Sequence, residues 1–222
     1  MCGRYALYGS KSKIKEHFGT ANALDLAPHY NITPTQIVPV VQINALGQRV
    51  FGLARWGLIP SWVKDSSEIQ HPINAKVETA AIKPMFRHAF RKSRVLVPAA
   101  AFYEWQPGAD GKQPWLIHLK DDELMGLGGL LEHWHVAEGE VLTFSILTTE
   151  PNPLMTTIHD RMPVIIQPAD YAAWLDPKLT DVTRIQTMAK PYPERLMEAF
   201  PVSRKVNNPL HDSADLIEEE KA

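Results

Sequence analysis

Cysteine is almost absent from this chain of 222 residues, which contains only one, Cys2. A single cysteine excludes an internal disulfide and any metal centre built from several thiolates, so the chain is compatible with a reducing compartment. Apolar residues make up 45% of the sequence, which is ample for a buried core. We therefore expect a fold that needs no covalent cross-link for its stability.

Long apolar runs are missing too. The first twenty residues contain no stretch of signal-peptide length, and no other segment approaches the ~20 apolar residues of a membrane span. These absences predict a soluble, cytoplasmic protein without membrane contact.

An excess of positive charge is also lacking, because the formal net charge at pH 7 is −2. Bulk electrostatic coating of nucleic acid is thereby excluded, since such binding grows with the number of phosphates that a protein neutralises. Any nucleic-acid site must be local. Basic residues do gather between Lys83 and Arg94, where the alternative is a solvated helix face. Acidic residues gather between Asp212 and Glu220, and this pattern predicts a frayed acidic tail.

Repeats and low-complexity linkers are absent, so a single domain is the simplest organisation. Helices are expected over 12–18, 78–92, 169–175 and 183–189, with the second kinked or split at Pro84. Hairpin turns are expected at 108–111 and at 138–139. Strand-like runs are more numerous than helices. They cover 37–43, 49–56, 94–98, 102–106, 115–119, 124–131, 141–148, 163–166 and 202–206. The pattern predicts an α+β fold, with a mainly antiparallel, curled or barrel-like sheet and flanking helices.

The position of Cys2 is unusual, because a residue so close to the terminus offers little to a packed core. Removal of Met1 would turn Cys2 into a 1,2-aminothiol, whose α-amine has a pKa of about 7.7–8.0. Roughly a fifth to a third of this amine is neutral near pH 7.4, against roughly 0.1% of a lysine. Such an amine forms a Schiff base with an aldehyde, and the neighbouring thiol closes it to a thiazolidine. Two alternatives stay open: an N-terminal nucleophile hydrolase, or an inert cysteine.

Five other segments could carry chemistry. Asn74, Lys76 and Glu78 combine an amide, a cation and a carboxylate, although capping of a helix would explain them. Glu104 lies in an aromatic strand, and an inward orientation would raise its pKa to the range of a proton shuttle. The segment 159–161 joins an imidazole, a carboxylate and a guanidinium, which could also form a structural ion pair.

His133 and His135 share one face of a strand, but no third zinc ligand is evident nearby. Trp56 and Trp62 flank a Gly/Pro turn. They could stack on splayed bases or belong to the core.

Six ordered motifs together resemble the SRAP family, the SOS-response-associated peptidases or abasic-site processing proteins. The resemblance extends to about Asn207, which predicts a SRAP domain over 1–207 and an acidic tail over 208–222. The motifs are Met1-Cys2-Gly3-Arg4-Tyr5, Tyr30-Asn31-Ile32-Thr33-Pro34, Arg55-Trp56-Gly57-Leu58-Ile59-Pro60-Ser61-Trp62, Asn74-Ala75-Lys76-Val77-Glu78-Thr79, Phe102-Tyr103-Glu104-Trp105 and His159-Asp160-Arg161-Met162-Pro163.

The resemblance implies an enzyme of DNA repair and the SOS response that captures the aldehyde of an abasic site in single-stranded DNA. Cys2 would supply amine and thiol, and Asn74 would position the opened sugar. Glu104 would move protons, and His159 would help to open the sugar ring. The resemblance also implies AP lyase activity, reversal of the crosslink and peptidase-like removal of Met1.

The same resemblance implies a positively charged cleft for single-stranded DNA, often at a junction with duplex. Its predicted DNA contacts are Arg4, Trp62, Lys76 and Arg161, and more loosely Arg87 and Arg91. It implies no cofactor and no metal. A monomer is expected, associated with the nucleoid when it is bound to DNA, and replication-fork proteins are conceivable partners.

This sequence departs from the family pattern at two places. Lys76 stands where arginine is usual, which keeps the charge but loses the bidentate phosphate fork. Ala100-Ala101 replaces the usual Asp-Gly before Phe102, which puts the local turn in question. Two further functions remain as alternatives: an N-terminal cysteine peptidase or amidohydrolase, and a non-enzymatic single-strand binding module.

Overall fold

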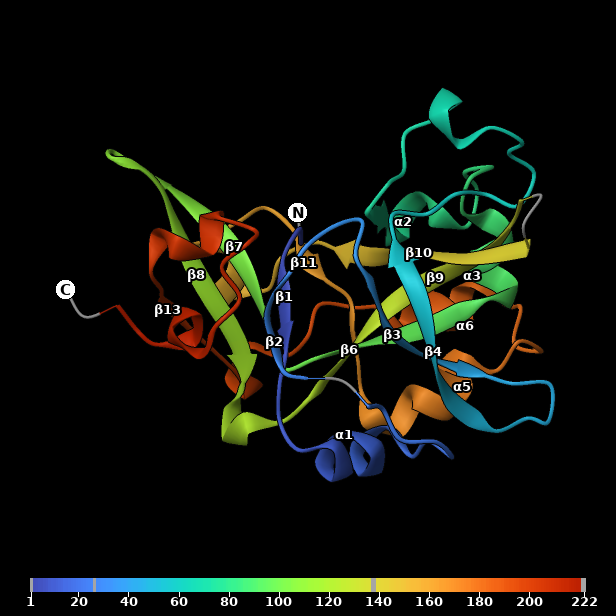
Figure 1. Cartoon of the computed structure of the whole chain (residues 1–222), viewed down its shortest axis with the longest axis horizontal. Helices are drawn as coiled ribbons and strands as arrows, with labels where there is room; N and C mark the ends of the chain where they lie inside the picture. The colour runs from blue at the N-terminus through green and yellow to red at the C-terminus, as the bar shows by residue number, and fades with distance from the viewer. Residues whose placement is uncertain (1, 26, 137–138, 221–222) are drawn as a thin grey trace.

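Two β-sheets, connected directly by the chain as it passes from one to the other, form the framework of the protein (Figure 1). The computed structural model describes residues 2–25, 27–136 and 139–220. The predicted removal of Met1 therefore concerns a residue outside the described ranges, and so does half of the predicted turn at 138–139.

The larger sheet contains a closed ring of five strands. β4 pairs with β3, β3 with β6, β6 with β9 and β9 with β10, all antiparallel, and β10 closes the ring by pairing with β4 in parallel. Three short strands pair with the parts of β9 and β10 that extend beyond the ring. β5 and β11 pair with β10, and β12 pairs with β9. The strands are β3 (Ile37–Ile43), β4 (Arg49–Trp56), β5 (Asn74–Lys76), β6 (Arg94–Ala99), β9 (Met125–Val136), β10 (Gly139–Thr149), β11 (Met162–Pro163) and β12 (Ile165–Ile166).

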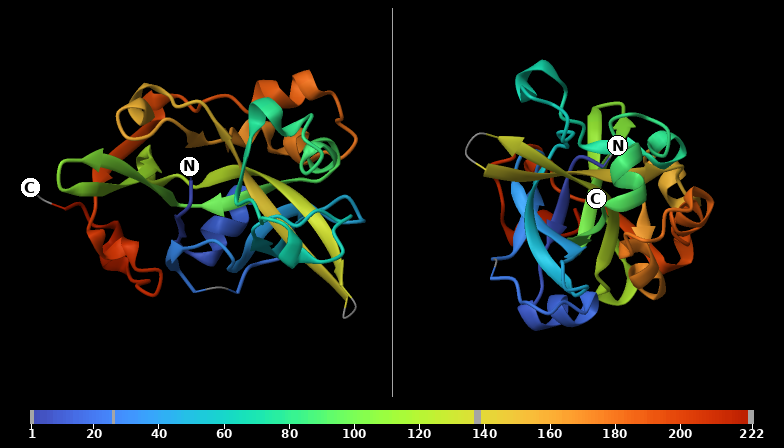
Figure 2. Two further views of the ribbon diagram at one scale, coloured as in Figure 1. Left: turned by 90° about the horizontal axis from the view of Figure 1, so that it is seen from above. Right: turned by 90° about the vertical axis from the view of Figure 1, so that its right-hand side faces the viewer.

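The smaller sheet is fully antiparallel and has the order β13-β8-β7-β1-β2. β7 follows β6 after a bend at Ala100, and the chain returns to the ring between β8 and β9. Seen from above, the β7–β8 hairpin and the C-terminal segment lie at one end of the molecule, and β9 and β10 extend towards the other (Figure 2). The strands are β1 (Tyr5–Leu7), β2 (His29–Ile32), β7 (Ala101–Gly108), β8 (Gly111–Leu119) and β13 (Met197–Pro201).

The helices are short and lie around the sheets. In α1 (Lys11–Phe18), Ser10 accepts a hydrogen bond from the Lys13 N–H as N-cap, and Gly19 ends the helix at φ 60°. Ile14 and Phe18, four residues apart, bury the same face of α1. The others are α2 (Val77–Ala80), α3 (Arg87–Lys92), α4 (Pro153–Thr156), α5 (Tyr171–Leu175) and α6 (Val182–Met188). No helix among the described residues is long and apolar enough to cross a bilayer.

The predicted fold class is confirmed. The sheet pairing is mainly antiparallel, one sheet closes into a barrel-like ring, and the helix expected over 78–92 is split into α2 and α3 around Pro84. The hairpin at 108–111 is also confirmed, because Gly108 pairs with Gly111. The turn at Ala100-Ala101, where the family usually has Asp-Gly, forms without glycine. The Ala100 N–H donates to the Ala6 carbonyl, and neither alanine has a positive φ.

Two expectations near the C-terminus are wrong. The strand expected over 202–206 lies earlier, in β13, while residues 204–207 form a 3₁₀ turn that buries Val206. Residues 208–220 are not frayed: Leu216 is buried, and the Asp212 carboxylate contacts His29 and accepts the Tyr30 N–H. Leu216 packs in a hydrophobic cluster and Asp215 forms an ion pair with Lys205, so packing and charge pairing together hold this segment.

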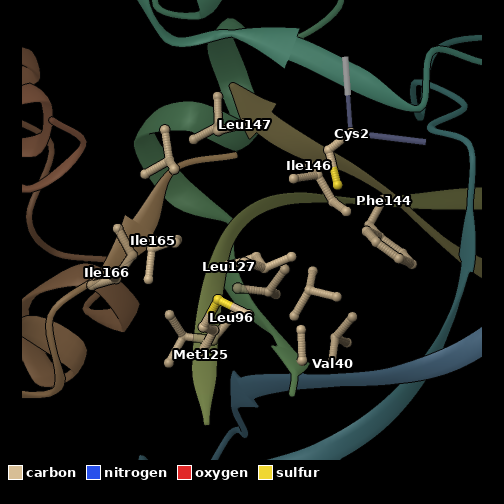
Figure 3. Close-up of a cluster of buried hydrophobic side chains, with 14 of the residues drawn as sticks. Cys2, Val40, Leu96, Met125, Leu127, Phe144, Ile146, Leu147, Ile165 and Ile166 are labelled. Atoms are coloured by element: carbon tan, nitrogen blue, oxygen red, sulfur yellow. The ribbon is translucent and has the colours of Figure 1, made fainter. Parts of the chain in front are cut away.

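A third expectation is corrected by the core. Cys2 is fully buried in the main hydrophobic cluster, and its sulfur points in beside Phe144 and Ile146 of β10 (Figure 3). A smaller cluster covers the other face of the second sheet and includes Tyr103 and Leu116. Cys2, three residues before β1, is thus a core residue, because the chain enters between the two sheets.

Candidate functional site

The site is built around Cys2, which precedes β1 at the junction of the two sheets. The Asn74 side chain, at the start of β5, donates a hydrogen bond to the Cys2 carbonyl at 2.8 Å. Burial raises the pKa of the Cys2 thiol far above its usual range, and the charge of Glu104 raises it further. The thiol is therefore protonated at neutral pH in this environment.

Glu104 reaches the site from β7, which pairs with β1 through Tyr5 and Phe102. Tyr103 lies on the opposite face of the strand, in the smaller cluster, so alternation directs Glu104 towards Cys2. The Glu104 side chain is 2% exposed, and burial raises its pKa to about 7. Glu104 therefore has the inward orientation that raises its pKa, and the carboxyl can hold or release a proton near neutral pH.

His159 approaches from the loop between α4 and β11. Its Nε2 lies 3.8 Å from Glu104 Oε2, and its Nδ1 accepts the Arg161 N–H at 3.0 Å and lies 2.9 Å from Asp160 Oδ1. Burial lowers the pKa of the imidazole, and the Asp160 carboxylate partly opposes that shift. The structure therefore brings Cys2, Asn74, Glu104 and His159 together from four distant segments.

Several buried polar atoms in this region have no hydrogen-bond partner among the described residues. They are the Tyr5 hydroxyl, Asn74 Oδ1, the Thr148 hydroxyl and the Nε atoms of Arg4 and Arg161. Buried polar atoms are normally paired, since an unpaired one costs about 1–3 kcal/mol. Unused hydrogen-bonding capacity beside a reactive residue is what a site for a polar ligand requires.

An open hollow of about 600 Å³ gives access to Glu104 and His159, and its remaining lining includes three cations. Arg4 is held there by Asn31 Oδ1 at 2.7 Å and the Val206 carbonyl, with its guanidinium over the Trp105 ring. Sequence reasoning missed the other two cations, Lys112 and Arg204. Lys112 lies at the β7–β8 hairpin and Arg204 in the C-terminal turn, so no local motif connects them.

Trp62 is 63% exposed on the loop after β4, whereas Trp56 is buried in the core. The barrel fixes this loop, because Thr143 bonds both backbone groups of Ile59 and the buried Glu132 accepts the Ser61 N–H at 3.2 Å. The exposed indole therefore projects from a loop that hydrogen bonds to the barrel hold in place.

The remaining predicted DNA contacts are more dispersed. Lys76 is exposed at the end of β5, and Arg87 is exposed on α3. Arg91 donates to the carbonyls of Ala81 and Arg87, so part of its hydrogen-bonding capacity is used within the fold. Arg161 is bound to Glu78 and to the Thr148 carbonyl.

The zinc alternative gains no support. His133 and His135 both lie near Glu140, at 3.0 and 3.8 Å, yet no group of three or more ligands suited to a metal occurs within the described ranges.

Comparison with known proteins identifies the family of the chain. The family model described as SOS response associated peptidase (SRAP) matches residues 1–209. The abasic site processing protein YoqW of Bacillus subtilis is 41% identical, over 98% of this chain and 99% of its own. The abasic site processing protein HMCES of Xenopus tropicalis is 29% identical over 86% of this chain and 65% of its own.

A crystal structure of a protein from Bacteroides thetaiotaomicron superimposes with a TM-score of 0.89. It is 25% identical and covers 99% of this chain and 100% of its own. The matched family model and the near full-length relatives agree with the six motifs: the chain belongs to the SOS response associated peptidase (SRAP) family.

Proposed function

We propose that this protein captures abasic sites in single-stranded DNA through a covalent bond to Cys2. The observation that carries the proposal is the convergence of Asn74, Glu104 and His159 on the chain's one cysteine, where Glu104 has a pKa of about 7. The names of YoqW and HMCES, both abasic site processing proteins, support the same substrate class.

The chemistry begins after Met1 has been hydrolysed from the chain. The α-amine of Cys2 adds to the aldehyde carbon of the ring-opened deoxyribose, and loss of water gives a Schiff base. The thiol sulfur then adds to the imine carbon while the nitrogen takes up a proton, which closes a thiazolidine. No oxidant or reductant is needed, and every proton can pass through Glu104 or His159.

Burial sets the order of these steps. The thiol is protonated, because burial raises its pKa far above neutral, whereas an α-amine ordinarily has a pKa of about 7.7–8.0. The amine therefore attacks first. Glu104 donates a proton to the departing water and, as a carboxylate, accepts the thiol proton during ring closure. His159, next to Glu104, assists the opening of the sugar ring, and Asn74 holds the reacting end of Cys2 in place.

DNA would contact cations on both sides of Cys2. β1 begins between the β7–β8 hairpin and the β5–α2 segment (Figure 1). Arg4, Lys112 and Arg204 form one flank, while Lys76 and Trp62, with Arg87 and Arg91 farther along, form the other. Two separate flanks suit a strand that bends at the lesion, as at a junction with duplex.

Two further activities follow from the same Schiff base. Proton removal next to the imine permits β-elimination of the phosphate, which is a lyase reaction. Protonation of the thiazolidine sulfur by Glu104 permits reversal of the crosslink. We propose both as secondary activities of a monomer.

The direct test mixes the protein with single-stranded DNA that carries one abasic site. Wild-type protein should give a slower band that survives heating, and intact mass should show loss of Met1 and of one water. Cys2→Ser retains the amine but lacks the thiol, so it should give a band only after borohydride reduction. Absence of the wild-type band, or an equally heat-stable unreduced band from Cys2→Ser, would contradict the proposal.

The same experiment separates the two alternatives. A binding module would hold intact and abasic strands equally without a covalent product. An N-terminal cysteine hydrolase would turn over peptide or amide substrates repeatedly.

A further inference from the structure

The Tyr5 side chain lies wholly within the core, yet its hydroxyl has no hydrogen-bond partner among the described residues. Alternation along β1 directs Tyr5 and Leu7 into the main cluster, while Ala6 between them faces the smaller one. An unpaired buried hydroxyl lowers the stability of a fold, and phenylalanine would fill the same space without that cost. A partner that forms only during the reaction would explain why the hydroxyl is there.

Aromatic rings connect Tyr5 to the reactive sulfur. The Tyr5 ring meets the Trp56 ring edge-on, with 5.3 Å between the centroids, and Trp56 stacks on Phe144 at 6.2 Å. The Cys2 sulfur lies beside Phe144 in the same cluster (Figure 3). Burial raises the pKa of Tyr5 well above its usual range, and the charge of a Cys2 thiolate raises it further. The phenol and the sulfur therefore lie within electrostatic reach of each other.

The sulfur needs a hydrogen-bond donor at one step of the reaction. Ring closure requires the thiol to lose its proton, but burial and the charge of Glu104 raise the thiol pKa, and the Arg4 backbone opposes this shift only in part. The Tyr5 phenol keeps its own proton near neutral pH, because its pKa is well above the usual value. It can therefore donate to a negatively charged sulfur but cannot act as the base.

We propose that the Tyr5 hydroxyl assists closure of the thiazolidine by donating a hydrogen bond to the Cys2 sulfur as the sulfur gives up its proton. The proposal rests on the capture reaction described above and assigns Tyr5 to its second half. The thiol proton passes to Glu104, a sulfur electron pair forms the carbon–sulfur bond, and the imine π pair returns to nitrogen, which takes up a proton. The phenolic proton stays on Tyr5 throughout. Formation of the Schiff base involves no sulfur and needs no hydroxyl at this position.

The test follows two products over time on saturating single-stranded DNA that carries one abasic site. The Schiff base is the band that appears only after borohydride reduction, and the thiazolidine is the band that survives heating without it. In Tyr5→Phe the Schiff base should form at the wild-type rate. The thiazolidine should form about 10- to 100-fold more slowly, as expected for the loss of one hydrogen bond to a charged group. The Schiff base should therefore accumulate in this variant.

Tyr103→Phe is the matched control. Tyr103 is equally buried, but its hydroxyl donates to the Tyr30 carbonyl at 2.7 Å, on the face of β7 opposite Glu104. This variant should close the ring at the wild-type rate, and its urea midpoint should fall because a hydrogen bond is lost. The urea midpoint of Tyr5→Phe should not fall, because the hydroxyl has no partner to lose. Slower closure without a loss of stability separates a chemical role from a structural one.

A second comparison removes the sulfur. Cys2→Ser forms the Schiff base without a thiol, so adding Tyr5→Phe to it should leave the rate of Schiff-base formation unchanged. An equal rate of thiazolidine formation in Tyr5→Phe and wild type would overturn the proposal. So would slower Schiff-base formation in Tyr5→Phe with and without the thiol, because the change would then act before the sulfur does. Absence of any covalent product with wild-type protein would instead contradict the proposed function.

Discussion

Two buried regions of this protein treat polar groups in opposite ways. Where α5 packs on β6, the guanidinium of Arg94 donates to four backbone carbonyls, those of Phe90, Trp174, Asp176 and Leu179. At the junction of the two sheets, the Tyr5 hydroxyl, Asn74 Oδ1 and the Thr148 hydroxyl have no partner among the described residues. Both regions are buried, so burial alone does not distinguish structure from function. The satisfaction of hydrogen bonds does.

The largest effect is expected at Glu104. Replacement by glutamine keeps the volume but removes the proton that the carboxyl exchanges near pH 7, so the crosslinking rate should fall about 10²- to 10⁴-fold. Wild-type rates should peak between about pH 7 and 8, where protonated Glu104 and neutral amine coexist. In Glu104→Gln, the crosslinking rate should no longer fall as the pH rises above 8. Rates measured from pH 5.5 to 9 check both, and a full rate in Glu104→Gln would remove Glu104 from the mechanism.

A loss of stability without loss of chemistry is expected at Arg94. Arg94→Met keeps the aliphatic stem and leaves the four carbonyls unpaired, which should lower the free energy of unfolding by about 4 kcal/mol. Urea unfolding measures this change. The folded variant should crosslink at the wild-type rate, since Arg94 lies away from Cys2. A loss below about 1 kcal/mol in the free energy of unfolding would show that the four hydrogen bonds of Arg94 contribute little to stability.

Glu104 should also cost stability as the pH rises. Its pKa is about 7 in the folded protein and near 4.5 without the surrounding burial, so the folded state binds the proton more tightly. The resulting stabilisation is full below about pH 4.5 and is lost as the pH rises through 7. Between pH 5 and 8, wild type should lose roughly 2–3 kcal/mol more than Glu104→Gln. An equal change in the free energy of unfolding between pH 5 and 8 in wild type and Glu104→Gln would contradict this.

The smallest contrast compares two buried threonines on β10. Thr143 accepts the Ile59 N–H and donates to the Ile59 carbonyl, so Thr143→Val should cost about 1–2 kcal/mol. The Thr148 hydroxyl has no partner in the described part of the chain, so Thr148→Val should change stability by less than about 0.5 kcal/mol. Equal costs in chemical unfolding would erase the comparison between the two regions.

Local signals in the sequence were sufficient for the longer elements. β3 and β4 have the bounds expected for them, because each is an apolar run that ends at turn residues. β1, β2 and β5 were missed, since three or four residues carry no periodicity and pair only when distant strands present an edge. The position of β13 was misjudged because Val202, directly after β13, forms only an isolated bridge with Glu219, and the buried Val206 belongs to a 3₁₀ turn.

The residues of the site also divide into those with a local sequence signal and those that depend on distant packing. Cys2, Asn74, Glu104 and His159 were identified from ordered motifs, and the structure brings them together. Their convergence supports the predicted roles, which the DNA experiments test. Lys112 and Arg204 could not be found from the sequence, because only the packing of the C-terminal turn against the β7–β8 hairpin brings them to one hollow.

The burial of Cys2 also has a consequence in time. The strands and loops that enclose it extend to residue 161, so its surroundings are complete only after most of the chain has been synthesised. At about 5–20 residues per second, Cys2 spends roughly 10–30 s outside any finished fold. An enzyme that removes the first residue has this interval to act.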